Sequence, residues 1–357
     1  MAVERMNREQ FLAKVGTIPQ DRLPLVLWNL YWRGPAAFRE RIEAELQPPA
    51  PGKSMTSEGG ASAAALGSVV LNEVSDFVRT ARSGAYLGGS RLVSKKDRAQ
   101  WRVIFRRLVN DALDLLGKGD VTHGATALEA LVDLACDATE FDFFHSEDPV
   151  AAMRLVVSDA VAALWKARLQ QGGFSDFAHH AAPQLLRWER AWGWTRRGEA
   201  ASVVDRERPL AEVLEQMLRG HDAWVAFSDA YLGALQLLGE PVPLPRAGKG
   251  RQTDVYRVKD LTERHRREAE RRAWNLQAWH LQLLDRLLGS EEEDRLVRLV
   301  GSTALRGPDL DFLGARLAWS RNDRERARAL MTACLKARPG DDRFRQWAVK
   351  MDLQGSL

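Results

Sequence analysis

The sequence predicts an all-α protein: a multi-helix array of helical hairpins with a small helical module at its N-terminus. Apolar residues recur every three or four positions along most of the chain, and the alternation typical of strands is nearly absent. Glycine and proline interrupt these segments at positions typical of helix ends. At 357 residues, the chain is long enough for about two domains.

Composition excludes several classes of protein. Hydrophobic residues make up 45% and charged residues 28%, as in globular chains and unlike disordered ones. The net charge of +4 excludes a histone-like polycation, and the balance of charges shows no acidic tail. Two cysteines cannot form a disulfide framework. No apolar run reaches the ~18 residues that cross a bilayer, and the first ten residues lack the apolar core of a signal peptide. We therefore expect a cytoplasmic protein that makes no membrane contact.

The N-terminal region predicts a helical hairpin followed by a linker. An apolar helix over 24–32 ends at Gly34, and Pro35 can open the next helix. These helices make up the predicted module 1–46. The segment 47–63 is rich in Pro, Gly and Ser and nearly free of large apolar side chains, so it predicts a flexible linker.

Residues 64–240 predict a central all-α domain. Its first helix has apolar residues on one face, and Ser94 with Asp97 resembles a capping box that opens the second. The apolar face of that second helix contains Trp101, Phe105, Leu108, Ala112 and Leu115. Further helices are predicted over 125–137, 149–169, 174–188, 210–218 and 222–238.

A Pro/Gly-rich break, 241–252, separates this domain from a C-terminal helical domain, 253–357. One long helix is predicted over 255–288. Its first half is almost entirely charged, and its second half is apolar from Trp274 onward. We expect the first half to be exposed and the second to be buried.

The segment 308–339 resembles one tetratricopeptide repeat. Small residues at helix contacts, a turn aspartate and a closing proline carry the resemblance: Leu317, Ala318, Asp323, Ala327, Met331, Cys334, Leu335 and Pro339. Asp311 and Ala315 replace the usual aromatic and glycine, and no second unit is evident. The resemblance implies an antiparallel helix pair. The whole chain also resembles uncharacterised helical proteins of high-GC bacteria, which implies no function.

Basic residues concentrate on the helix predicted to follow Ser94. Four of them recur at helical spacing opposite the Trp101 face, and the helix begins beside a glycine-containing loop. This arrangement suits an anion such as a nucleic-acid phosphate. The candidate residues are Arg91, Lys95, Lys96, Arg98, Arg102 and Arg106.

An alternative is that these cations are neutralised within the protein. Glu129, Asp133 and Asp137 are spaced to lie on one face of the next long helix, where they could pair with the basic face. Because the net charge is only +4, we favour this pairing. The same carboxylates could instead form a solvated face or an acid–base group.

A second candidate surface combines tryptophan with arginine. Its residues are Trp188, Trp192, Trp194 and Arg196, a combination found at interface hot spots and base-stacking platforms. The same pattern also fits a tryptophan-stapled corner between helices, which is the interpretation that we favour.

No pattern in the sequence supplies a catalytic, cofactor or metal site. Gly250 follows Lys249 where a P-loop requires Ser or Thr. The metal-ligand residue types around His145 lack ligand spacing. Cys136 and Cys334 lie on predicted apolar faces, where a thiol is usually inert. We therefore expect no enzyme, but a helical adaptor or scaffold that binds another protein. The alternative is a nucleic-acid-binding accessory protein that uses the basic helix near 91–107.

Overall fold

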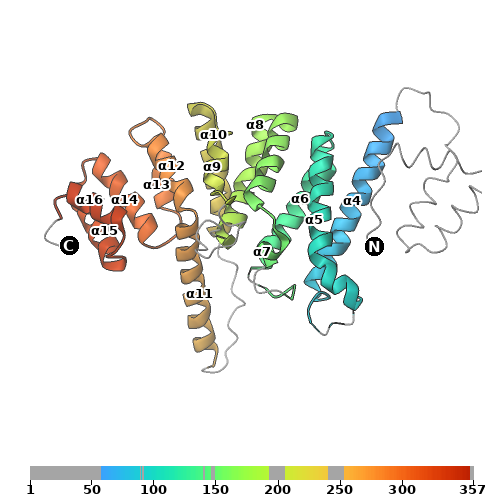
Figure 1. Cartoon of the computed structure of the whole chain (residues 1–357). Helices are drawn as coiled ribbons and strands as arrows, with labels where there is room; N and C mark the ends of the chain where they lie inside the picture. Colours follow the sequence, from blue (N-terminus) through green and yellow to red (C-terminus); the bar gives the residue numbers. More distant parts are fainter. Residues whose placement is uncertain are drawn as a thin grey trace, which may run out of the picture. The chain divides into compact units, whose positions relative to one another are not determined.

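The computed structural model confirms the all-α class. It describes residues 58–88, 90, 92–139, 141–145, 149–192, 206–239 and 253–353. Within these ranges every regular element is a helix, and the sole β-type pairing is an isolated bridge between Tyr86 and Phe144. Several helices that follow one another pack together, as α5 does on α6 and α14 on α15 (Figure 1).

The helices of the first half are α4 (Glu58–Arg82), α5 (Lys95–Gly117), α6 (Val121–Asp137), α7 (Pro149–Met153), α8 (Val157–Trp192), α9 (Leu210–Glu215) and α10 (His221–Gly239). The helical backbone of α8 is interrupted by a kink at Gly173. Those of the second half are α11 (Thr253–Asn275), α12 (Gln277–Leu287), α13 (Asp294–Val300), α14 (Pro308–Ser320), α15 (Arg324–Ala337) and α16 (Asp342–Lys350).

The start of α4 corrects the predicted linker. The helix begins at Glu58, so residues 58–63 are helical and not part of a flexible segment. Alanine, the strongest helix former, is frequent from Ala61 onward and favours this extension. The rest of the linker and the predicted hairpin 1–46 lie outside the described residues. Residues Ala61–Leu357 form one compact unit.

One hydrophobic core extends from α4 to α14 and includes side chains from both sides of the predicted break. Phe227 and Tyr231 of α10 contact Trp279 of α12, with ring centroids 5.3 and 5.7 Å apart. The break itself, 241–252, lies outside the described residues, so the domain boundary there stays a prediction. The helices on its two sides nevertheless share a core.

The predicted long helix is two helices, because the chain turns at Leu276 between α11 and α12. Leu283 and most apolar residues after the turn are buried as expected, but Trp274 is 39% exposed. Ala273 and Leu276, on either side of Trp274 in the sequence, are buried. Before the turn, Arg266 and its neighbours on α11 are exposed and bond to glutamates of the same helix.

The C-terminal helix pair packs through small residues. Gly314 of α14 allows close packing, because an added Cβ would lie only 3.2 Å from Cδ1 of Leu330 of α15 and this side chain would have to shift. Asp323 begins α15, where its carboxylate accepts a hydrogen bond from the backbone N–H of Arg326 at 3.1 Å. This geometry is that of an antiparallel helix pair; the tetratricopeptide resemblance itself stays a prediction.

Candidate functional site

Helix α5 separates apolar from charged side chains. Trp101 and Phe105 are buried in the core, whereas Lys95, Arg102 and Arg106 are exposed. This division follows from the helical spacing in the sequence, because the two sets are centred about 100° apart around the helix. The basic residues are therefore available to solvent.

An open groove of about 420 Å³ lies at the start of α5. The segment 141–145 helps to form it, because Phe144 stacks on Trp101 with ring centroids 4.1 Å apart and bridges to Tyr86 through the backbone. Its basic lining residues are Lys95, Arg98, Arg102 and His145. The sequence predicted the basic helix but not the contribution of His145.

The cations of this groove contact only neutral groups among the described side chains. Arg98 donates a hydrogen bond to the backbone carbonyl of Ser90. The Arg102 guanidinium lies 5.5 Å from the centre of the Trp101 ring, and Nε of Arg106 donates to the carbonyl of Arg102 at 3.3 Å. Lys96 is exposed, and Arg91 lies outside the described residues.

The favoured pairing with the acidic stripe is wrong for Lys95, Arg98, Arg102 and Arg106, which contact none of its three carboxylates, but Arg82 of the same basic stretch, 79–107, does pair with the stripe. Glu129 and Asp133 both pair with Arg187 of α8, each at 2.7 Å, and Asp137 pairs with Arg82 of α4 at 2.6 Å. The reason is the packing of α6, whose acidic side faces arginines of α8 and α4. The presence of opposite charges on neighbouring segments of the sequence was therefore not enough to predict which side chains form ion pairs.

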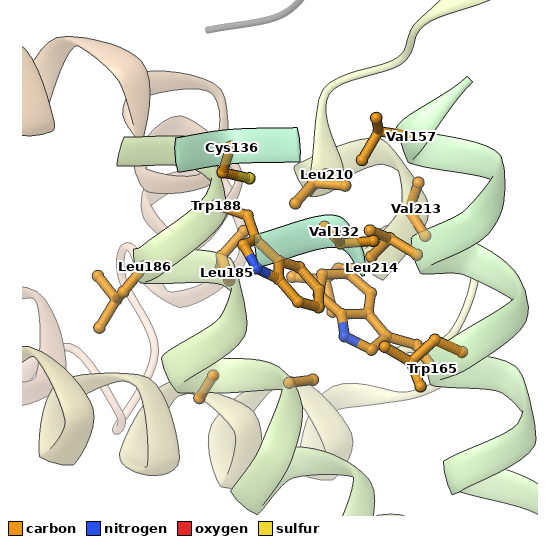
Figure 2. Close-up of a cluster of buried hydrophobic side chains, with 14 of the residues drawn as sticks. Val132, Cys136, Val157, Trp165, Leu185, Leu186, Trp188, Leu210, Val213 and Leu214 are labelled. Atoms are coloured by element: carbon orange, nitrogen blue, oxygen red, sulfur yellow. The ribbon is translucent and has the colours of Figure 1, made fainter. Parts of the chain in front are cut away.

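Trp188 belongs to the core and not to an exposed partner surface. Its side chain is fully buried, stacks on Trp165 at 6.5 Å between ring centroids, and donates a hydrogen bond to Asp133 at 2.7 Å. Figure 2 shows both indoles among aliphatic side chains of α6, α8 and α9. Trp194 and Arg196 lie outside the described residues, as does the side chain of Trp192.

Burial and charge act in opposite directions on this cluster. Burial raises the pKa of Asp133 above its ordinary value of 3.8, although the contacts with Trp188 and Arg187 oppose the rise. Burial lowers the pKa of Arg187, but the carboxylates of Asp133 and Glu129 more than offset it and raise that pKa overall. The cluster is therefore a partly desolvated ion pair held by an indole N–H.

Neither cysteine is placed to act as a nucleophile. Burial raises the pKa of Cys136 well above 9.0 and that of Cys334 to about 12, so both stay protonated at neutral pH. Within the described ranges no group of three metal-ligand residues converges on one point. The P-loop-like residues near Lys249 lie outside those ranges.

Sequence reasoning missed two grooves beside α13. One, of about 330 Å³, lies between α13 and the pair α14–α15, and the other, of about 310 Å³, lies between α10 and α13. Gly301 lines both. The one sequence signal was a pair of small residues, Gly301 and Gly314, on either side of a helix junction.

Comparison with known proteins gives no relative from which a function could be inferred, so the functional proposal rests on the structure. No protein-family model, curated protein or solved structure matches the chain. None of the helices in the described ranges combines the length and the apolarity that crossing a bilayer requires.

Proposed function

We propose that the chain is a non-enzymatic helical adaptor that binds an acidic segment of a partner protein. The observation that carries the proposal is the pair of grooves that flank α13 and meet at Gly301. A groove between packed helices is a common place for a protein to hold a helical or extended peptide. The tetratricopeptide resemblance of 308–339 covers helices that form one of these grooves.

The floor of the two grooves is apolar. Leu232 and Leu235 line the groove beside α10, and Val300 and Leu317 line the groove beside α14. Val297 is 40% exposed and lines the groove between α13 and the pair α14–α15. Covering such side chains would remove apolar surface from water, which is the main favourable contribution to most protein association.

The rim favours an acidic partner. Arg298, Arg321 and Arg326 line the grooves, against one carboxylate, Asp323, which is engaged as the N-cap of α15. The ion pairs of Arg298 and Arg321 on this surface are long, at 3.4 to 3.5 Å, and both arginines are exposed, as are their partners Asp229 and Asp294 but not Glu293. Exposed pairs of this kind contribute little to stability, so these arginines can exchange partners at little cost.

The test uses the full chain as bait, with one valine substituted in the groove and a matched valine outside it. Val297→Glu places a charge on the groove floor, and Val349→Glu does the same on α16, where the valine is similarly exposed, at 45%. Captured polypeptides are quantified by mass spectrometry after nuclease treatment and a high-salt wash. We expect a partner that wild type and Val349→Glu retain and Val297→Glu loses at least about tenfold, because a buried unpaired charge is costly.

The captured partner should also be bound through an acidic segment. A synthetic peptide of that segment should bind the wild-type chain, and the same peptide with its acidic residues replaced by Gln should bind more weakly. Equal capture by the two glutamate variants would contradict the proposal, as would a partner that nuclease releases.

A further inference from the structure

We propose that the groove at the start of α5 binds the phosphate backbone of single-stranded nucleic acid. This site is separate from the grooves beside α13, and none of its residues belongs to them. The proposal therefore does not depend on the adaptor function. It rests on the cations of the groove, their spacing and an exposed aromatic residue nearby.

The charge of the groove is the first step. Lys95, Arg98 and Arg102 line it, and no carboxylate is among its lining residues. Acids do pair with other arginines of the same region: Arg107, further along α5, bonds to Glu73 at 2.8 Å and to Asp111 at 2.9 Å. The groove cations thus keep their charge uncompensated by any described side chain, as an anion site requires.

The spacing of the cations is the second step. Lys95, Arg98, Arg102 and Arg106 are three or four residues apart, so they follow one face of α5. With a rise of 1.5 Å per residue, the row is roughly 16 Å long. A single phosphate would contact one end of such a row. A strand with regularly repeated phosphates can contact all of it, so the row favours a polyanion.

An exposed aromatic residue favours a single strand over a duplex. Phe141 is 58% exposed and stacks on Phe143, with ring centroids 5.9 Å apart. It lies on the segment 141–145, which ends at His145 in the groove. An unpaired base can stack on such a ring, whereas the bases of a duplex are already stacked on one another. Cations beside an exposed aromatic are the usual components of single-strand sites.

The experiment measures the fluorescence anisotropy of a labelled single-stranded oligonucleotide of mixed sequence, titrated with the full chain. Lys95→Glu/Arg102→Glu reverses two groove cations. Lys166→Glu/Arg219→Glu is the matched control, because it makes the same change in net charge at exposed residues outside the groove. We expect at least about tenfold weaker binding by the first variant and a change below about twofold for the control.

Two further measurements test the phosphate contacts and the stacking. Wild-type affinity should fall with salt at a slope of about −0.7 per phosphate contact, so contacts to three or four cations of the row give a slope of about −2 to −3. Phe141→Ala should weaken single-strand binding by about fivefold or more without affecting thermal stability, because stacking of a base on an aromatic ring is lost.

Several outcomes would overturn the proposal. Equal loss of binding in the two double reversals would show a general charge effect. A duplex of the same sequence that binds as tightly, with no effect of Phe141→Ala, would exclude a single-strand site. If pyrophosphate displaces the oligonucleotide when the two are present at equal concentration, the ligand of the groove is a small phosphate compound. Binding to vesicles of anionic lipid without binding to the oligonucleotide would identify a membrane surface.

Discussion

Two charged helix faces that are neighbours in the sequence differ in whether their charges are paired within the structure. The acidic face of α6 is paired: Glu129, Asp133 and Asp137 each contact an arginine of another helix. The basic face of α5 has no such partner among the described side chains, although α5 packs directly on α6. Adjacent helices with complementary net charge therefore need not pair with each other.

The difference teaches that pairing depends on which sides of two helices meet. The helices α5 and α6 contribute apolar residues such as Phe105, Leu108 and Leu128 to one core, so their charged sides are directed elsewhere. The acidic side of α6 meets α8 and α4, where it is partly buried. The basic side of α5 remains in contact with solvent. The first face stabilises the fold, and the second is left available for a ligand.

Removing the carboxylate of Asp133 should produce the largest effect. Asp133→Ala leaves the buried indole N–H of Trp188 without an acceptor and takes one of the two carboxylates from Arg187. We expect the free energy of unfolding in urea to fall by about 1 to 3 kcal/mol. Asp133→Asn keeps an acceptor oxygen and should lose less. Equal losses in the two variants would mean that the hydrogen bond to Trp188 contributes nothing.

The second-largest effect should be a pH dependence of stability that comes from the acidic face of α6. Because burial raises the pKa of Asp133 above 3.8, the folded chain takes up this proton at a higher pH than the unfolded chain does. Its contribution to stability therefore grows as the pH falls through the raised pKa and is complete below 3.8. Urea unfolding from neutral pH down to about pH 4 should show wild type gaining stability relative to Asp133→Asn. Parallel pH profiles would contradict the assigned direction.

Reversing the basic face should have the smallest effect on stability. Lys95→Glu/Arg102→Glu breaks no ion pair with a described carboxylate and loses one exposed contact between Arg102 and Trp101. We expect the free energy of unfolding to change by less than about 1 kcal/mol. A loss as large as that of Asp133→Ala would show that this face is paired after all and would remove the contrast between the two helices.

Much of the fold was predictable, because local pattern and burial agree along most of the chain. The apolar spacing identified the buried side of α5, and the turn aspartate Asp323 identified the start of α15. The break at Leu276 was not predicted, since Asn275 is the only weak helix former beside it and no proline or glycine marks it. The sequence left Trp188 as either a surface residue or part of a corner between helices, because tryptophan is common both in cores and at interfaces.

By itself the sequence determined most of the helices, the apolar face of α5 and the presence of a basic row on α5, because each depends on residues a few positions apart. Tertiary structure alone decided which charges meet. Arg187 lies more than fifty positions from its two carboxylates, and His145 reaches the groove through the packing of Phe144 on Trp101. Such contacts depend on how helices pack, and helix packing is determined by the shape of the whole core and not by any one segment.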